Sequence, residues 1–539
     1  MKIANALFLS KVALLFGIPF GLVLLIVPAS AAQTRSCEGL TGLNLPNVQL
    51  TATVTPAGSP MPTAGGRAVN PRRDETVNGR GTGRGNGTGS TRVISVSYCR
   101  VQGIIEGTIR FEVWLPDEWN HKFYTATVGG YAGSIGYTGM LPALLKGYAT
   151  ASTDTGHQGG GSDFMKNMEA ITNYGYRGVH LTAVAAKKII TAYYGKAPEY
   201  SYLCGCSGGG YAGLANAQRF PDDFDGIASG APSTYFTHHA GRAIWSWQVN
   251  KSGSPGYIPP AKDKLLWQPV VAACDALDGV TDGLIENPLA CKFDFKKIQC
   301  EAGKDLDTCL TPAQVLTAAK IYGPMNDASG KEVYPATALG TPVSDDALET
   351  RAKFYAAFWR DAVFNDPQWD MSTFKVEDVA KADGMFGSAL ISANPDLRAY
   401  KNHGGKLIIY HGWDDPGVSP LNSLEYYQSV EKQLGPKATD EFVRLFLMPG
   451  MFHCGGGPGP NTFDMLSVLE KWVEDGKAPE SIIASHITDG KVDRTRPICR
   501  YPETAHYIGT GSTDDAANFR CETSDRTPEG GSRLAPSRH

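Results

Sequence analysis

The chain has 539 residues, of which 42% are hydrophobic and 19% are charged, and its formal net charge is −4. This length exceeds one small module and can bury a large core, and the composition is globular, not disordered. The charge balance lacks the basic footprint of nucleic-acid-binding proteins, so no nucleic-acid partner is expected.

Residues 1–32 are expected to form a signal peptide. A basic start leads into an apolar run at 12–27, and small residues follow it, which is the pattern that a signal peptidase recognises. Cleavage is expected after Ala31 or Ala32. An uncleaved membrane anchor is the alternative, but Pro19 interrupts the run and a bilayer span needs about 20 apolar residues. We therefore expect a secreted or periplasmic protein without stable membrane association.

Residues 58–91 are rich in Gly, Pro, Arg and Asn, and they predict a surface loop between two strands. After this loop, segments of apolar, β-branched and aromatic residues predict strands. The strands are expected at 93–99, 109–116, 122–130, 148–156, 199–205 and 224–232, and the helices at 176–194 and 211–220. This order implies right-handed crossovers and a mainly parallel sheet.

The alternation lapses between 233 and 400, where the sequence has mixed helical character. It resumes with a strand at 406–412, a helix at 420–434, a strand at 441–450 and a helix near 461–476. This arrangement predicts an α/β core that a large insertion interrupts. The first part of the core is expected at 33–232, the insertion at 233–400, and the second part of the core with a C-terminal tail at 401–539.

Ser207 is the candidate catalytic residue with the most specific local context. The segment Gly205-Cys206-Ser207-Gly208-Gly209 fits the pattern G-x-S-x-G between a predicted strand and a predicted helix. A nucleophile at such a turn lies in a strained backbone conformation that small neighbours tolerate. The helix that follows offers oriented N–H groups to an oxyanion. The alternative is a glycine-rich turn whose serine only caps the helix.

Two further residues complete a candidate catalytic triad. In α/β-hydrolases the chain order is serine, acid, histidine. Asp414 and Asp415 follow the first strand after the insertion, and His453 follows the next strand. An acid at the carboxyl end of a strand is well placed to orient an imidazole, so the triad Ser207, Asp415, His453 is predicted. His411 is the rival base, but it precedes the acid and is interpreted as structural, with its ring bonded to the backbone.

The oxyanion hole is expected to combine the Gly208 N–H with an N–H from the loop after residues 122–128. That loop begins with Gly129 and Gly130, and a pair of glycines lets the backbone approach a substrate closely. Gly130 is the first choice and Gly129 the second. A plain turn between a strand and a helix is the alternative.

A second candidate site lies in the insertion, where three carboxylates fall within eight residues and glycines separate them. Asp275, Asp278 and Asp282 would repel one another unless a cation binds, and hard oxygen ligands favour calcium. An EF-hand is excluded, because its twelfth position would be Leu289 and not Glu. An acidic surface turn is the alternative.

The chain contains 11 cysteines, and in an oxidising compartment most of them are expected to pair. The odd count leaves at least one thiol without a partner in the chain. Short separations suggest the local pairs Cys274–Cys291, Cys300–Cys309 and Cys499–Cys521. Cys206 and Cys454 each adjoin a predicted triad residue, so a bridge between them would join nucleophile and base. Two unrelated buried thiols are the alternative.

The arrangement Cys206-Ser207, Asp415 and His453-Cys454 resembles that of the tannase and feruloyl esterase family, which includes the hydrolase of mono(2-hydroxyethyl) terephthalate. The resemblance extends over nearly the whole predicted mature chain. It implies an α/β-hydrolase fold in which the insertion is a lid. It also implies Ser207 as nucleophile, His453 as general base and then acid, and Asp415, not Asp414, as the residue that orients His453.

The resemblance further implies five disulfides, namely Cys37–Cys99, Cys206–Cys454, Cys274–Cys291, Cys300–Cys309 and Cys499–Cys521. Cys204 is then the odd thiol. A structural Ca²⁺ in the lid is also implied, bound by side chains of Asp275, Asp278 and Asp282 and by backbone oxygens of Val280 and Leu284. The chain departs from the family pattern C-S-T-G-G-R-Q, because Tyr211 and Ala212 replace the Arg and Gln.

These features predict a secreted serine carboxylic ester hydrolase that cleaves feruloyl or galloyl esters of small size through an acyl-enzyme. A hydrolase of the mono(2-hydroxyethyl) terephthalate type is the alternative, and it needs a cation facing the substrate carboxylate, for which Arg351 and Arg360 are candidates. A serine peptidase and a non-catalytic binding protein are the remaining classes. No oligomeric state is predicted. Aromatic residues of the insertion that could clamp the substrate ring are Tyr257, Trp267, Phe354, Tyr355, Phe358, Trp359, Trp369 and Phe386.

Overall fold

The computed structural model describes residues 34–63 and 92–523. The predicted signal peptide and most of the predicted loop at 58–91 lie outside these residues. At the described flanks of that loop, β2 (Ser59–Pro60) pairs antiparallel with β3 (Val93–Ile94). Within the described ranges, no helix combines the length and the apolar character that a membrane span requires.

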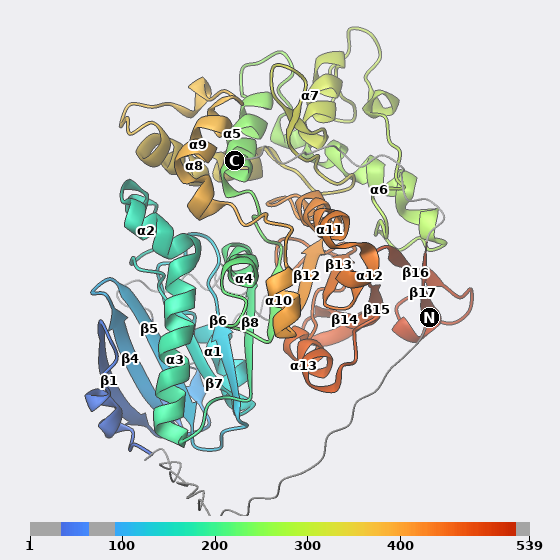
Figure 1. Ribbon diagram of the computed structural model, residues 1–539. Helices are drawn as coiled ribbons and strands as arrows, with labels where there is room; N and C mark the ends of the chain where they lie inside the picture. Colours follow the sequence, from blue (N-terminus) through green and yellow to red (C-terminus); the bar gives the residue numbers. More distant parts are fainter. Residues whose placement is uncertain (1–33, 64–91, 524–539) are drawn as a thin grey trace, which may run out of the picture.

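A nine-stranded sheet forms the centre of the molecule (Figure 1). In spatial order its strands are β1 (Val48–Thr55), β4 (Tyr98–Ile105), β5 (Ile109–Pro116), β7 (Ala149–Thr153), β6 (Lys122–Ala126), β8 (Tyr200–Cys206), β9 (Gly226–Gly230), β12 (Lys406–Gly412) and β13 (Val443–Met448). The junctions from β1 to β7 are antiparallel, and those from β7 to β13 are parallel. The predicted mainly parallel sheet is confirmed. The carboxyl ends of β8, β12 and β13 therefore face the same side.

Helices cover both faces of this sheet. On one face, the buried cluster includes residues of α3 (Gly178–Tyr194), α4 (Gly208–Arg219) and α11 (Pro420–Leu434). On the other, it includes residues of α1 (Tyr137–Leu145) and α13 (Met465–Asp475). Successive residues of β12 alternate between the two clusters, because side chains along a strand point to opposite faces. A strand buried on both faces therefore has a continuous apolar sequence.

The insertion between β9 and β12 lies beyond one end of the sheet (Figure 1). Its elements are α5 (Phe236–Val249), α6 (Gln268–Cys274), α7 (Pro312–Tyr322), β10 (Met325–Asn326), β11 (Glu332–Tyr334), α8 (Asp345–Ala357), α9 (Asp378–Leu390) and α10 (Arg398–His403). One hydrophobic cluster joins α5, α8 and α9 to Tyr131, Phe164 and Tyr174 of the core. The insertion is thus packed against loops of the core and is not an independent unit.

The chain enters α3 through α2 (Met168–Thr172) and a π-helical turn at Asn173–Arg177. The α-helical part therefore begins at Gly178, two residues after the predicted start. The π-helical turn packs closely on α9, because a Cβ on Gly175 would lie 2.2 Å from the carbonyl oxygen of Ala389. Turns of this type are frequent at functional sites.

The C-terminal tail forms two antiparallel pairs outside the central sheet, where no elements are predicted. β14 (Ser481–Thr488) pairs with β15 (Lys491–Cys499), and β16 (Glu503–Tyr507) pairs with β17 (Phe519–Thr523). The disulfide Cys499–Cys521 joins the two pairs.

Five disulfides form among the described residues, and they are the five predicted pairs. They join Cys37–Cys99, Cys206–Cys454, Cys274–Cys291, Cys300–Cys309 and Cys499–Cys521. Cys204, in β8, is free and buried, as the resemblance implies.

Candidate active site

Ser207 lies at a sharp turn between β8 and α4. Its backbone has φ +62° and ψ −122°, a conformation that a residue with a side chain adopts only under strain. Two close approaches surround the turn: a Cβ on Gly205 would lie 1.8 Å from Thr127 Oγ1, and a Cβ on Gly210 would lie 2.1 Å from the carbonyl oxygen of Gly230. Packing therefore requires glycine on both sides of Ser207.

The three predicted triad residues meet at the carboxyl ends of three parallel strands. Ser207 follows β8, Asp415 follows β12 and His453 follows β13. His453 Nε2 lies 2.8 Å from Ser207 Oγ, and His453 Nδ1 lies 2.6 Å from Asp415 Oδ2. Both are hydrogen-bond distances, and the geometry allows His453 to accept a proton from Ser207.

Asp415 is buried, and both of its carboxylate oxygens are hydrogen-bonded. Oδ1 accepts from the N–H of Gly417 at 2.6 Å and from that of Val418 at 3.0 Å. Burial alone would raise the pKa of this carboxyl, but the charge of His453 and the hydrogen bonds from His411 and His453 lower it well below its usual range. Asp415 therefore stays ionised at neutral pH.

Asp414 has the opposite character. His453 Nδ1 donates its hydrogen bond to Asp415 and not to Asp414, and burial raises the pKa of Asp414 to about 7. Two adjacent carboxyls thus shift in opposite directions, because imidazole rings face Asp415 while burial dominates at Asp414.

His411 lies in β12 and its side chain is completely buried. Its Nε2 lies 3.0 Å from the carbonyl oxygen of Val418, which is the expected backbone contact. The same nitrogen lies 3.0 Å from Asp415 Oδ2, and Nδ1 lies 2.7 Å from Ser423 Oγ. The contact with the acid is not part of the sequence-based interpretation.

Gly129 and Gly130 lie beside the predicted nucleophile. A Cβ on Gly208 would lie 3.3 Å from the Gly130 nitrogen, and a Cβ on Gly129 would lie 3.6 Å from Ser207 Cβ. Gly130 has φ +60°, which favours glycine. Its carbonyl oxygen accepts a hydrogen bond from Tyr174 Oη at 3.0 Å. The two predicted oxyanion donors are therefore close neighbours, and Tyr174, which the sequence does not single out, holds the loop.

Helix α8 of the insertion contacts both loops of the site. Arg351 donates hydrogen bonds from its two terminal nitrogens to the carbonyl oxygens of Pro416 and Gly417. The Phe354 ring stacks on Tyr131, with centroids 4.4 Å apart and an interplanar angle of 8°. Tyr131 Oη also donates to the Phe354 carbonyl at 3.2 Å. One helix thus packs on the loop of the acid and on the loop of the glycine pair.

The remaining predicted residues of the insertion have other partners. Arg360 pairs with Asp361 at 2.7 Å, and Tyr257 donates to Asp345 at 2.9 Å. Three more of these residues are buried in the hydrophobic cluster of the insertion, namely Phe358, Trp359 and Phe386. Among the eight candidate aromatic side chains, Phe354 and Tyr355 are the ones whose rings contact Tyr131 in the glycine loop.

The disulfide Cys206–Cys454 joins the residue before Ser207 to the residue after His453 across 248 positions of sequence. Both cysteines are buried. The bond restrains the two loops relative to each other, so that the separation between serine and imidazole is covalently limited.

Asp275, Asp278 and Asp282 lie on one loop after α6. Asp275 accepts hydrogen bonds from the N–H groups of Asp282 at 3.0 Å and Gly283 at 2.9 Å, and Asp282 pairs with Arg496. Among the described residues, no group of three or more His, Cys, Asp or Glu side chains is arranged to hold a metal ion.

The donors of this loop still suit a hard cation. Val280 and Leu284 are buried, and within the described part of the chain their carbonyl oxygens accept no hydrogen bond. Burial raises the pKa of Asp278, and the charge of Asp282 adds to that increase. A cation bound by oxygen atoms would satisfy the carbonyls and relieve the repulsion.

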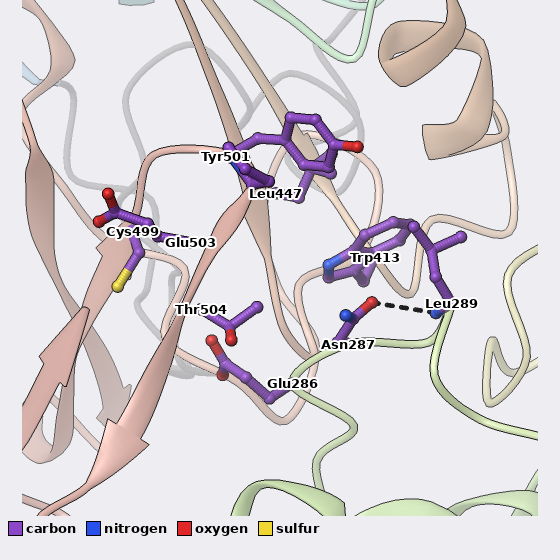
Figure 2. Close-up of a pocket in the computed structure, with 10 residues that line it drawn as sticks. Glu286, Asn287, Leu289, Trp413, Leu447, Cys499, Tyr501, Glu503 and Thr504 are labelled. Atoms are coloured by element: carbon purple, nitrogen blue, oxygen red, sulfur yellow. Dashed lines mark hydrogen bonds between the residues drawn. The ribbon is translucent and has the colours of Figure 1, made fainter. Parts of the chain in front are cut away.

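Two cavities lie away from the triad. One has a volume of about 20 Å³, room for a single water molecule, and Figure 2 shows Glu286 beside Thr504, and Trp413 beside Leu289. The other, of about 450 Å³, is lined mostly by apolar residues of the insertion, with Asp294 and Thr337 among them, and by Leu421 of α11. Ser207, Asp415 and His453 line neither cavity.

Comparisons with known proteins show which family the chain is similar to. A family model described as tannase and feruloyl esterase matches residues 91–522. An uncharacterized esterase of Xanthomonas campestris pv. campestris is 34% identical over 491 residues, which cover 80% of this chain and 85% of that protein. A probable feruloyl esterase B-2 of Aspergillus terreus is 31% identical over 465 residues, which cover 80% of this chain and 87% of that protein.

Solved structures are similar over almost the whole chain. Feruloyl esterase B from Aspergillus oryzae has a TM-score of 0.81 at 28% identity, covering 90% of this chain and 100% of that one. Tannin acyl hydrolase from Aspergillus niger has a TM-score of 0.72 at 20% identity, covering 89% and 92%. This second likeness is one of fold alone.

Proposed function

Because the chain belongs to the tannase and feruloyl esterase family and is a carboxylic ester hydrolase, we propose that it cleaves esters of aromatic acids through an acyl-enzyme on Ser207. The observation that carries the proposal is the continuous set of hydrogen bonds from Ser207 Oγ through His453 to Asp415, at 2.8 Å and 2.6 Å. The strained backbone of Ser207 at the end of β8 supports the same role.

In the proposed reaction, Ser207 Oγ attacks the ester carbonyl carbon while His453 Nε2 takes the hydroxyl proton. The N–H groups of Gly208 and Gly130 stabilise the negative oxygen of the tetrahedral intermediate. The carbon–oxygen bond to the alcohol then breaks, and His453 returns the proton to the leaving oxygen. Water, deprotonated by His453, attacks the acyl carbon. The bond from that carbon to Ser207 Oγ breaks as His453 gives its proton to Oγ, which releases the acid and restores Ser207. Asp415 keeps the imidazole oriented and stabilises its charged form.

The proposed substrates are small feruloyl or galloyl esters. Relatives named feruloyl esterase support this class. The half-buried ring of Phe354, which stacks on the buried Tyr131, offers apolar surface next to the glycine loop. The terephthalate half-ester is the alternative. It would need a free cation near the site, whereas two nitrogens of Arg351 bind backbone carbonyls and Arg360 pairs with Asp361.

The test is turnover of methyl ferulate, methyl gallate and mono(2-hydroxyethyl) terephthalate by the mature protein, with a peptide p-nitroanilide as the amide control. We expect hydrolysis of a ferulate or gallate ester that Ser207→Ala abolishes. Hydrolysis of the half-ester alone would select the alternative substrate. Amide cleavage at a comparable rate would indicate a peptidase. A folded wild-type protein that hydrolyses none of the three esters would refute the proposed substrate class.

We also propose that the protein is exported. Five disulfides support an oxidising compartment, and the predicted signal peptide provides the route. The measurement is the N-terminal sequence of the protein recovered from the periplasm or medium of its host. A mature N-terminus at Ala32 or Gln33 is expected, and a retained Met1 would contradict export with cleavage.

A structural Ca²⁺ in the aspartate loop is the third proposal. Asp275, Asp278 and Asp282 would supply side-chain oxygens, and Val280 and Leu284 backbone oxygens. Two observations support this site. Val280 and Leu284 are buried, and the pKa of Asp278 is raised, first by burial. Removal of Ca²⁺ with EGTA is expected to lower the melting temperature, and excess Ca²⁺ to restore it. Asp278→Asn should blunt the response and Asp294→Asn should not. A melting temperature indifferent to both treatments would exclude the ion.

A further inference from the structure

A single oxygen of the predicted catalytic acid receives hydrogen bonds from two imidazole rings. Asp415 Oδ2 lies 2.6 Å from His453 Nδ1 and 3.0 Å from His411 Nε2. Asp415 Oδ1 is occupied separately by the N–H groups of Gly417 and Val418. The second imidazole is not needed to satisfy the carboxylate, so its presence calls for a different reason.

The partners of His411 determine where its proton lies. Nε2 faces two acceptors, the Asp415 carboxylate and the Val418 carbonyl oxygen, each at 3.0 Å. Nε2 therefore carries the hydrogen, and Nδ1 accepts from the Ser423 hydroxyl at 2.7 Å. The ring is inaccessible to solvent, so water cannot replace these bonds.

We propose that His411 is a positioning residue for catalysis: its neutral Nε2–H holds Asp415 Oδ2 and limits the negative charge that acts on His453. This inference rests on the proposed serine esterase function. The hydrogen bond acts at low dielectric, where a donor to a charged oxygen has a large effect. Ser423 from α11 acts in turn on His411, because it fixes the tautomer.

The charged and titratable groups around His411 come from four parts of the fold. Asp415 and His453 lie near it in their loops, His239 in α5 and Arg351 in α8. His239 interacts electrostatically with His411 and with the other three groups, and Asp415 interacts with His411 and His453. Burial lowers the pKa of His239 well below its ordinary value, so that ring stays neutral. Asp415 and Arg351 are then the constant charges, and His453 is the group whose charge changes during turnover.

Loss of the Nε2–H donor has a defined consequence. Gly417 and Val418 still hold Oδ1, so the carboxylate stays near His453. Its oxygen Oδ2 then interacts with His453 alone, which stabilises the charged imidazole. The acid limb of the profile of kcat/KM against pH reports that protonation. It should therefore move to higher pH when the donor is removed.

The test measures this profile with a p-nitrophenyl ester for His411→Leu, His411→Gln and Ser423→Ala. His411→Leu is expected to lower the plateau of kcat/KM about 10- to 100-fold and to raise the acid limb by about half to one pH unit. His411→Gln keeps an N–H near the position of Nε2 and should return the limb toward the wild-type value. Ser423→Ala should shift it in the same direction as His411→Leu, but less.

His180→Gln is the matched control, because His180 also pairs with an aspartate, Asp223 at 2.7 Å, away from the triad. Its profile should equal that of the wild type. A His411→Leu limb that is unmoved or lower, with only the melting temperature reduced, would overturn the proposal and leave His411 a packing residue. If His411→Leu fails to fold, an unmoved limb in Ser423→Ala overturns it equally. Failure of wild-type turnover, or its persistence in Ser207→Ala, would instead refute the proposed function.

Discussion

The core and the insertion each contain a partly buried pair of histidine and aspartate, and the two pairs have similar geometry. In the core, His453 Nδ1 lies 2.6 Å from Asp415 Oδ2. In the insertion, His238 Nε2 lies 2.8 Å from Asp383 Oδ2. The pair of the insertion joins α5 to α9, and the pair of the core joins the loops after β12 and β13.

The difference lies in the second nitrogen of each ring. In His453 it faces the hydroxyl of Ser207, whereas in His238 it lies 2.6 Å from the Val333 carbonyl oxygen. A carbonyl oxygen has no proton to give, so the pair of the insertion has no hydroxyl to activate, and it links α5 to α9 and β11. A histidine–aspartate contact by itself therefore does not identify a catalytic pair. The group that contacts the second ring nitrogen decides the role of the histidine.

The largest expected effect separates these two pairs. His453→Ala should reduce kcat by about 10⁴- to 10⁶-fold, because the proposed reaction loses both its base and its acid. His238→Ala should leave kcat within about twofold and lower only the melting temperature. Steady-state kinetics on a methyl ester and thermal unfolding check both. Equal losses in the two variants would mean that the core pair is not catalytic.

The two adjacent carboxyls offer the next comparison. Asp415→Asn should lower kcat by about 10⁴-fold, because the imidazole loses its orienting charge. Asp414→Asn should change kcat by less than about threefold, because Asp414 makes no hydrogen bond to His453 among the described residues. The measurement is kcat at pH 8, above the value of about 7 to which burial raises the pKa of Asp414. A larger loss at Asp414 would reverse the assignment of the acid.

Disulfides of the two regions can be compared in the same way. Replacing both cysteines of Cys206–Cys454, or both of Cys274–Cys291, should lower the free energy of unfolding by about 2–5 kcal/mol. Only the first pair adjoins Ser207 and His453, so only its loss should also lower kcat. Denaturant unfolding and kinetics on the folded fraction separate the two effects. A kcat unaffected by loss of Cys206–Cys454 would limit that bond to stability.

Arg351 links the two regions, and its replacement should have a smaller effect. Arg351→Met removes the hydrogen bonds to the Pro416 and Gly417 carbonyls and is expected to lower kcat about tenfold. KM should change little, because the turn of the acid is disturbed and not the substrate surface. Arg360→Met is the control from the same segment. A selective rise in KM would show instead that Arg351 binds substrate.

The smallest expected effect concerns the contact between the insertion and the core. Burial, and then the charge of Glu332 in β11, raises the pKa of Glu425 in α11 from 4.5 to about 8. The folded state thus binds more protons than the unfolded state in this interval, so the free energy of unfolding falls as pH rises from about 4.5 to about 8. Glu425→Gln should flatten this slope, as measured by urea unfolding across that pH range. A slope of unfolding free energy against pH that Glu425→Gln leaves unchanged would contradict the raised pKa of Glu425.

Local sequence was informative where a residue and its neighbours in the chain define the structure. The turn at Ser207 is such a case, because the pattern G-x-S-x-G between a predicted strand and a predicted helix places it between β8 and α4. The contacts that require glycine at 205 and 210 come from Thr127, directly after β6, and from Gly230 in β9. The strand at 406–412 and the helix at 420–434 have the predicted bounds, because their apolar periods are long and uninterrupted. No elements are predicted in the tail, although β14 to β17 form two antiparallel pairs outside the main sheet.

The sequence by itself determined the nucleophile turn, the order of serine, acid and histidine, the short-range cysteine pairs and the division into core and insertion. The tertiary structure decided which neighbours act on these residues. His411 contacts Asp415, Tyr174 holds Gly130, and Arg351 binds the turn of the acid. The first two contacts lie within the core, and the third joins the insertion to the core. A parallel sheet places the carboxyl ends of its strands together, so residues that follow different strands in the sequence can meet at one edge. Side-chain partners across such distances follow from packing, which no local pattern records.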